Sequence, residues 1–149
     1  MSKEKLIEMI KKGESETLEF KPSLSQTNEI IEAISAFANK KGGMILVGVS
    51  NSGEILGIES GKDSIEKLTN KIIQNTEPKA YPNISVEMIS GKKIIVIEVK
   101  ESKEKPVFAF GRAFKRVGKS SLRMSSEEIK GMVLENRKVY WDEQICENA

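Results

Sequence analysis

The segment that most constrains the fold is Met-Ile-Leu-Val-Gly-Val, residues 44–49, which is a nearly continuous apolar run. Such a run is typical of a central strand that is buried on both faces of a sheet. The preceding residues, 30–39, place apolar side chains at helical spacing, and Gly42 and Gly43 end that helix. We therefore expect a buried central strand with this helix packed across it. A turn should lead from the strand into a shorter strand over 54–58.

The other periodicities predict a mixture of helices and strands. Helical spacing of apolar residues indicates helices over 3–11 and around 65–72, whereas alternation indicates a strand over 17–21. The pattern then changes to four short strands joined by turns, at residues 84–90, 92–99, 106–110 and 112–117. Together these elements predict an α+β fold, in which amphipathic helices pack on a mixed β-sheet that has a buried central strand.

A capping box marks the start of the last helix. Ser125 and Glu128 stand three residues apart, so that each side chain can accept a hydrogen bond from the other residue's backbone N–H. Beyond this cap, the apolar residues follow helical spacing. We expect the helix to turn Ile129, Met132 and Val133 toward the core.

The length of 149 residues is that of one domain, and no internal repeat or low-complexity linker divides the chain. We predict a single domain over residues 1–137, with a C-terminal tail or truncated linker over 138–149. No apolar run approaches the ~20 residues that span a bilayer, and the N-terminus lacks the apolar core of a signal peptide. We therefore expect a cytoplasmic protein that makes no contact with a membrane.

The absence of histidine limits the chemistry that this chain can perform. The sequence has no histidine and a single cysteine, Cys146. These counts exclude Ser-His and Cys-His nucleophile pairs, histidine metal sites, a cysteine-rich zinc site and an intramolecular disulfide. Any catalysis would depend on carboxylates, lysines and backbone groups. The acidic candidates are Glu14 and Glu19, at the entry of the predicted strand 17–21.

Positive charge is concentrated in residues 100–123. This stretch holds eight basic and two acidic side chains, whereas the rest of the chain carries a net charge of −4. Such an excess is typical of a surface that binds a polyanion, and it is equally compatible with a solvated face. The candidate nucleic-acid-binding residues lie in the predicted strand 112–117 or shortly after it, and they are Arg112, Lys115, Arg116, Lys119 and Arg123.

Both faces of the strand 112–117 carry charge. Alternation places Arg112, Phe114 and Arg116 on one face, with Lys115 on the other. This pattern favours an edge hairpin whose loop, 118–121, offers backbone amides and hydroxyls to phosphates. An isolated aromatic residue on a strand packs inward more often than it stacks on a base. We therefore expect Phe114 to be buried.

Three segments of the chain form a set of motifs in a fixed order. The central segment is residues 36–58, from Ala-Phe-Ala-Asn-Lys-Lys-Gly-Gly through the buried strand to Gly-Ile. The opening motif is Gly-Glu-Ser-Glu-Thr-Leu-Glu-Phe-Lys, residues 13–21. The closing segment, 105–129, contains a glycine-turned hairpin and then Arg-x-Gly-x-Ser, which falls on Arg116, Gly118 and Ser120. Together the three motifs resemble the Schlafen AlbA-like domain, which is also described as divergent AAA, and they occur in the order found in that family.

The resemblance implies a nucleic-acid-binding domain of the kind found in transcriptional regulators. Such a domain would contact phosphates through its basic C-terminal hairpin, with DNA as the favoured ligand and RNA as the alternative. In prokaryotic relatives a C-terminal ATPase-like or winged-helix region follows, and residues 139–149 resemble the connection to it. A protein-interaction or dimerisation module, including a homodimer, is an alternative that the sequence leaves open.

The resemblance also raises the possibility of a nuclease. In Schlafen proteins with ribonuclease activity, the two glutamates of the opening motif join an aspartate after the central strand to hold a divalent metal, such as Mg²⁺ or Mn²⁺. Glu14 and Glu19 match the two glutamates, whereas Ser50 or Asn51 stands at the third position. Losing one carboxylate of three weakens a site for a hard cation. We therefore expect no cofactor and no hydrolysis, with a metal-dependent nuclease as the alternative.

Each of the two glutamates also has an ordinary structural interpretation. Glu19 would be a solvated residue beside Lys21 on the polar face of the strand, as is common in half-buried strands. Glu14 would cap the turn that follows Gly13. These interpretations are compatible with a binding domain that performs no chemistry.

Overall fold

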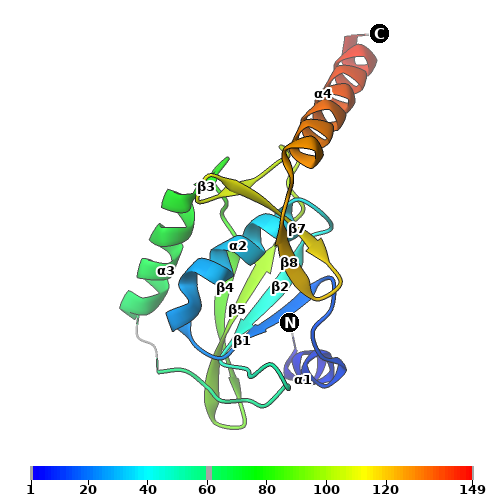
Figure 1. Cartoon of the computed structure of the whole chain (residues 1–149). Helices are drawn as coiled ribbons and strands as arrows, with labels where there is room; N and C mark the ends of the chain where they lie inside the picture. Colours follow the sequence, from blue (N-terminus) through cyan, green and yellow to red (C-terminus); the bar gives the residue numbers. More distant parts are fainter. Residues whose placement is uncertain (1, 60–61, 149) are drawn as a thin grey trace.

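The computed structural model describes residues 2–59 and 62–148 of the chain, with the side chains of 2–59 and 63–137. Helices and strands are mixed along the chain (Figure 1). In chain order the elements are α1 (Lys3–Lys12), β1 (Leu18–Lys21), the 3-10 helix η1 (Leu24–Gln26), α2 (Thr27–Ala38), β2 (Gly43–Val47), α3 (Lys62–Asn75), β3 (Thr76–Glu77), β4 (Asn83–Ile89), β5 (Lys92–Val99), β6 (Phe108–Ala109), β7 (Arg112–Val117), β8 (Ser120–Arg123) and α4 (Ser126–Asn148). Within the described part, no helix is both long and apolar enough to cross a membrane.

Four strands form sheet A, in the order β1-β2-β5-β4. β1 runs parallel to β2, and the pairs β2–β5 and β5–β4 are antiparallel, so the sheet is mixed as predicted. β2 lies between two partner strands, and its residues Ile45, Leu46 and Val47 are fully buried. The prediction of a buried central strand is confirmed.

Helix α2 lies between sheet A and a second sheet (Figure 1). Eight of its twelve residues are buried, which explains why its sequence is apolar on more than one side. Toward sheet A it shares an apolar cluster with Ile45 and Ile95. Toward the other sheet the same cluster contains Val107 and Phe114. The helix predicted over 30–39 is therefore the centre of the core.

The two glycines after α2 are required by close packing. Gly42 has a φ of +79°, and a Cβ atom there would lie 2.6 Å from the backbone oxygen of Val99. A Cβ on Gly43 would lie 2.5 Å from the ring of Phe37. Both distances are too short for a side chain, so these positions let the chain pass directly from α2 into β2.

Helix α1 covers the other face of sheet A. Leu6 and Ile10 are buried in a second apolar cluster with Phe20, Leu46 and Ile94. Alternate residues of β2 and β5 belong to the two clusters, because successive side chains of a strand point to opposite faces. The layers are thus α1, sheet A, α2 with α3 beside it, and the second sheet.

The second sheet, sheet B, is antiparallel with the order β3-β6-β7-β8. Two of its strands were not predicted from the sequence, β3 and β8. The hairpin loop expected over 118–121 is shorter, because β8 already begins at Ser120. The strand expected over 54–58 is absent: this segment makes one isolated bridge, between Val49 and Ile55, and the backbone oxygen of Gly48 accepts hydrogen bonds from Leu56 and Gly57.

Helix α4 projects away from the rest of the domain (Figure 1). It continues through residue 137, where we placed the end of the domain. Ile129 and Met132 are half-buried at its base, but Val133 is 39% exposed. The expectation that Val133 turns inward is therefore wrong, because the helix leaves the core within its first turns.

Candidate functional site

Arg116 lies inside the protein, with 1% of its surface exposed. Its Nη1 donates hydrogen bonds to Glu19 Oε1 at 2.6 Å and to Ser121 Oγ at 2.9 Å. Its Nη2 donates to the backbone oxygens of Ser15 at 2.9 Å and Leu18 at 3.1 Å. The guanidinium group therefore ties the β7–β8 hairpin to β1 and to the segment before it.

The prediction that Arg116 contacts phosphates is corrected by this burial. The guanidinium carbon also lies 4.7 Å from the centre of the Phe37 ring, which suits a cation–π contact. The alternation of side chains along the predicted strand already indicated that Arg116 points inward. Arg116 shares a face with Phe114, which we expected to point inward and which is 7% exposed.

Glu19 is buried with its partner, 7% exposed, and is not the solvated residue that we expected. Its Oε1 accepts the hydrogen bond from Arg116, and its Oε2 lies 3.9 Å from Lys21 Nζ. A buried carboxylate needs such a partner because an unpaired charge in the interior is costly. Glu19 and Arg116 therefore form a buried ion pair between the opening and closing motifs.

The opening motif also caps the outer edge of β1. The backbone oxygens of Thr17 and Lys21 accept hydrogen bonds from β2 and the residues after it. Because backbone groups alternate in direction along a strand, those of Leu18 and Phe20 point away from β2. The oxygen of Leu18 accepts from Ser15 N at 2.9 Å as well as from Arg116, and Phe20 N donates to Glu14 Oε1 at 3.0 Å. Unpaired edge groups invite pairing with another strand. Side chains and a turn therefore close sheet A on this side.

This arrangement does not fit a bound metal ion. One oxygen of Glu14 is occupied by the N–H of Phe20, and one oxygen of Glu19 by the guanidinium of Arg116. Ser50, one of the two residues that stand at the third position, bonds to Ser52 and to the backbone N–H of Glu54. In the part of the chain that the structure describes, no three His, Cys, Asp or Glu side chains lie close enough together to hold a metal ion.

Ser35 in α2 and Asn39, which caps the end of this helix, connect the helix to sheet B. Asn39 Oδ1 accepts from Val107 N at 2.6 Å, and its Nδ2 donates to the oxygens of Val107 at 3.0 Å and Phe114 at 2.9 Å. Ser35 Oγ accepts from Phe114 N at 3.1 Å and donates to the oxygen of Val107 at 2.7 Å. These bonds satisfy backbone groups that a neighbouring strand would otherwise pair. We did not predict either role, because buried polar residues in a helix resemble surface residues in the sequence.

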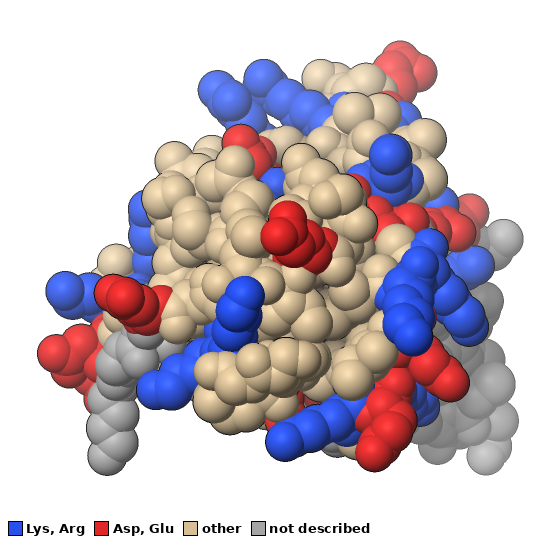
Figure 2. All heavy atoms as spheres, turned by 90° about the horizontal axis from the view of Figure 1, so that it is seen from below, with Lys and Arg blue, Asp and Glu red and all other residues tan. Residues whose placement is uncertain are grey.

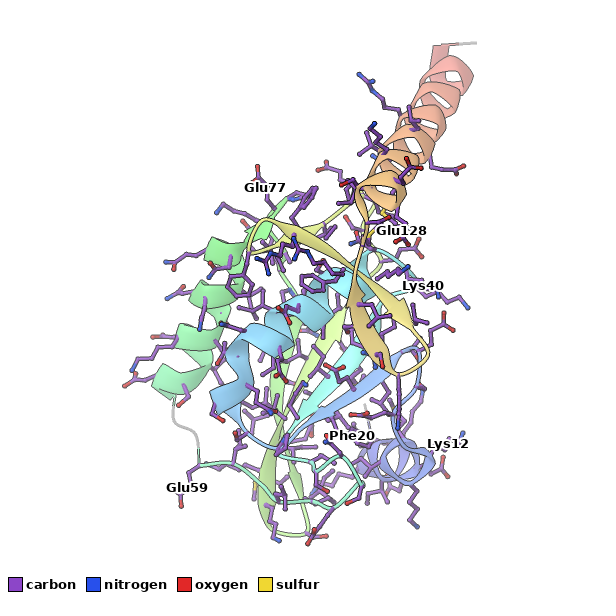
Figure 3. The ribbon with its side chains drawn as sticks, viewed as in Figure 1. Lys12, Phe20, Lys40, Glu59, Glu77 and Glu128 are labelled. Atoms are coloured by element: carbon purple, nitrogen blue, oxygen red, sulfur yellow. The ribbon has the colours of Figure 1, made fainter. Side chains whose placement is uncertain are left out.

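Lys115 holds the start of α4 against the hairpin. Its ammonium group pairs with Glu128, which Figure 3 labels at the base of that helix. Glu128 Oε1 accepts from Ser125 N at 3.1 Å, and Ser125 Oγ accepts from Glu128 N at 3.2 Å, so the predicted capping box is confirmed. The hydrogen bond from Lys115 and then that from Ser125 N lower the pKa of Glu128 below its ordinary value. Lys115 is therefore not a free cation.

Lys40, also labelled in Figure 3, supports the hairpin from the end of α2. Its Nζ donates to the backbone oxygen of Arg116 at 3.1 Å and pairs with Glu16. The hydrogen bond and charge of Lys40 lower the pKa of the Glu16 carboxyl. The hairpin is thus held from α2, from β1 and from the start of α4.

Three of the five candidate residues, Arg112, Lys119 and Arg123, are exposed to solvent. Among the described residues none of these three takes part in an ion pair. Arg112 and Arg123 lie at one end of the hairpin and Lys119 at its turn, so the cations are separated by a strand about 17 Å long at ~3.4 Å per residue. Val117 and Leu122 are 48% and 45% exposed. We use the name basic hairpin for the set Arg112, Val117, Lys119, Leu122 and Arg123.

Figure 2 shows the molecule from below. The charge distribution at this end differs from that of the basic hairpin. Lys and Arg side chains there are interspersed with Asp and Glu around broad uncharged areas. This end contains the turn between β4 and β5 and the loop that follows β2 (Figure 1). A mixed distribution of this kind is typical of an ordinary solvated surface.

The fold and the site define a class: an α+β domain in which a basic hairpin is joined to a mixed sheet by a buried Glu–Arg pair. The model of the family described as Schlafen, AlbA_2 matches residues 14–125, which is most of the chain. The chain therefore belongs to the Schlafen AlbA_2 family. The match includes residues 14–21 of the opening motif, the central strand and the hairpin.

Two solved structures have a similar fold. One is the DIP2311 protein from Corynebacterium diphtheriae, with a TM-score of 0.61 and 21% identity, over 73% of this chain and 25% of that protein. The other is the N-terminal domain of a RecG-related protein from Nitrosomonas europaea, with a TM-score of 0.59 and 23% identity, over 81% of this chain and 92% of that domain. The chain thus spans a quarter of the first protein and nearly all of the second domain. A comparison with curated proteins finds no match.

Proposed function

We propose that this domain binds nucleic acid, with DNA as the preferred ligand, by contacting phosphates through the basic hairpin. The observation that carries the proposal is the exposure of Arg112, Lys119 and Arg123 with no acidic partner among the described residues. Cations that are unpaired and held on a fixed element can neutralise phosphates without first breaking an ion pair. The anchoring by Arg116 supplies the fixed element.

Membership of the Schlafen AlbA_2 family supports this function. The similar domain from Nitrosomonas europaea belongs to a protein named as related to the ATP-dependent DNA helicase RecG, which favours DNA over RNA. Val117 and Leu122 are exposed on the face of the hairpin that carries Lys115, where they can contact sugars or bases. We also propose that the domain serves as the DNA-contacting module of a cytoplasmic, regulator-type protein and that binding needs no cofactor.

The proposal predicts a specific salt dependence. If each of the three cations neutralises one phosphate, the log–log slope of affinity against salt on duplex DNA is about −2.7, at roughly −0.9 per phosphate. Fluorescence anisotropy with short labelled duplexes measures Kd over a range of salt concentrations. Arg112→Ala, Lys119→Ala and Arg123→Ala should each flatten the slope by about 0.9.

Lys67→Ala is the matched control, because Lys67 is exposed on α3 and lies outside the hairpin. This variant should keep the wild-type slope. Single-stranded DNA and RNA probes of the same length test the preference for duplex DNA. Undetectable binding to every probe at ~50 mM salt, or an unchanged slope in the triple alanine variant, would refute the proposed interface.

A further inference from the structure

The two edges of sheet A differ in whether their outward backbone groups have hydrogen-bond partners. The edge at β1 is capped by Glu14, Ser15 and Arg116, whereas β4 forms the opposite edge and pairs with β5 alone. Among the described residues, no backbone group of β4 bonds to any element other than β5. Alternate residues of a strand direct their N–H and C=O groups to its free side. The outer side of β4 is therefore a row of unused backbone donors and acceptors seven residues long.

The composition of β4 does not protect this edge. Natural edge strands are usually blunted by lysine, by proline within the strand or by a bulge. β4 has no lysine, proline or bulge in its sequence Asn-Ile-Ser-Val-Glu-Met-Ile, its one charged side chain is Glu87, and its pairing with β5 is continuous over all seven residues. Val86 and Met88 expose 38% and 41% of their surface. An edge that is apolar and regular is suited to receive another strand.

The sequence of β4 is self-complementary, and this property selects the partner. We propose that β4 pairs with β4 of a second copy of this chain, antiparallel about a twofold axis at Val86. On the face toward α2 and α3, Val86 would then lie opposite the partner's Val86, and Ile84 opposite the partner's Met88. On the other face, Ser85 would lie opposite the partner's Glu87, a pair that can form a hydrogen bond. No two like charges face each other directly.

Charge at the ends of the strands favours the same antiparallel orientation. β5, next to β4, has Lys92 and Lys93 at one end and Glu98 near the other, all exposed. An antiparallel addition places the lysine end of one copy level with the glutamate end of the other across the two β4 strands, about 14 Å away, whereas a parallel addition would place like ends at that distance. At this separation the preference is weak and is screened at ~0.1 M salt. The result is one continuous eight-stranded sheet with a twofold axis.

The oligomeric state of the full chain tests this inference independently of nucleic acid. Sedimentation velocity over ~5 to ~200 μM should give a mass that rises with concentration toward twice 16.6 kDa. Val86→Lys places two ammonium groups at the axis and should weaken self-association by at least ~10-fold while the far-UV circular dichroism stays unchanged. Val117→Lys makes the same change at a comparably exposed strand position in sheet B and should keep the dimer.

A cysteine cross-link tests the register even if Val86→Lys fails to fold. In a Cys146→Ser background, Val86→Cys should form a disulfide-linked dimer on mild oxidation, because directly opposite residues have Cα atoms ~4.5–5.5 Å apart. Ser85→Cys is the control one residue away, since its two copies would be offset by two residues and lie beyond the ~7 Å that a disulfide spans. A wild-type chain that stays monomeric over the whole range, or equal cross-linking of the two cysteine variants, would overturn the proposal.

Discussion

Replacing Arg116 by alanine should destabilise the whole domain and not merely weaken the binding of a ligand. The substitution removes hydrogen bonds to Glu19, Ser121 and the oxygens of Ser15 and Leu18, and it leaves Glu19 buried without its guanidinium partner. Breaking a buried ion pair by removing one partner costs about 3–5 kcal/mol. In a domain of this length 1 kcal/mol lowers Tm by about 2–4 °C, so Arg116→Ala should lower Tm by about 6–20 °C.

Thermal and urea unfolding, followed by far-UV circular dichroism, measure this loss. Arg112→Ala is the matched control: it removes the same side chain from an exposed position of the same strand, and it should change the unfolding free energy by less than ~0.5 kcal/mol. Glu19→Gln keeps an acceptor oxygen for Arg116 and should cost less than the arginine deletion, about 1–3 kcal/mol. A loss below ~1 kcal/mol for Arg116→Ala would contradict the buried pair, because that is the value for a solvated one.

Two further predictions concern the contacts that hold the hairpin. Asn39→Ala leaves Val107 N and the oxygen of Phe114 without their partner and should cost about 2–4 kcal/mol in urea unfolding, whereas Asn28→Ala, on the exposed side of α2, should be nearly neutral. The pKa of Glu128 is lowered in the folded state, so its contribution to stability is present above the ordinary value of 4.5 and is lost as pH falls through the lowered pKa. Glu128→Gln should therefore flatten the fall of Tm below pH 4.5, and an acid limb identical to that of the wild type would contradict the contact with Lys115.

Local patterns in the sequence predicted the elements whose cause is local. The apolar run of β2, the helical spacing in α2 and the capping box of α4 each depend on residues close together in the chain. β8 was missed because Ser-Ser-Leu-Arg has only one apolar residue and therefore no alternation to detect. The strand expected over 54–58 has the right composition, but Gly57 adopts a φ of +77° and bonds back to Gly48, which ends any extended pairing.

The candidate site was less predictable because its decisive contact is not local. Glu19 and Arg116 are 97 residues apart, and nothing in either neighbourhood indicates that the two charges meet in the interior. We predicted that both side chains are exposed, because charged residues usually lie at the surface. The three residues that remain available, Arg112, Lys119 and Arg123, could not be distinguished by type from Lys115 and Arg116 without the packing around them.

The hydrogen bonds from Ser35 and Asn39 to Val107 and Phe114 make the hairpin part of a single cooperative unit. Val107 and Phe114 share their apolar cluster with α2, so sheet B has no interior of its own that would survive separation from the helix. We expect their backbone amides to exchange with deuterium only when the domain unfolds globally. A ligand that binds the hairpin only in the folded state would then raise the free energy of unfolding of the entire domain. The increase would be RT ln(1 + [L]/Kd), where [L] is the free ligand concentration.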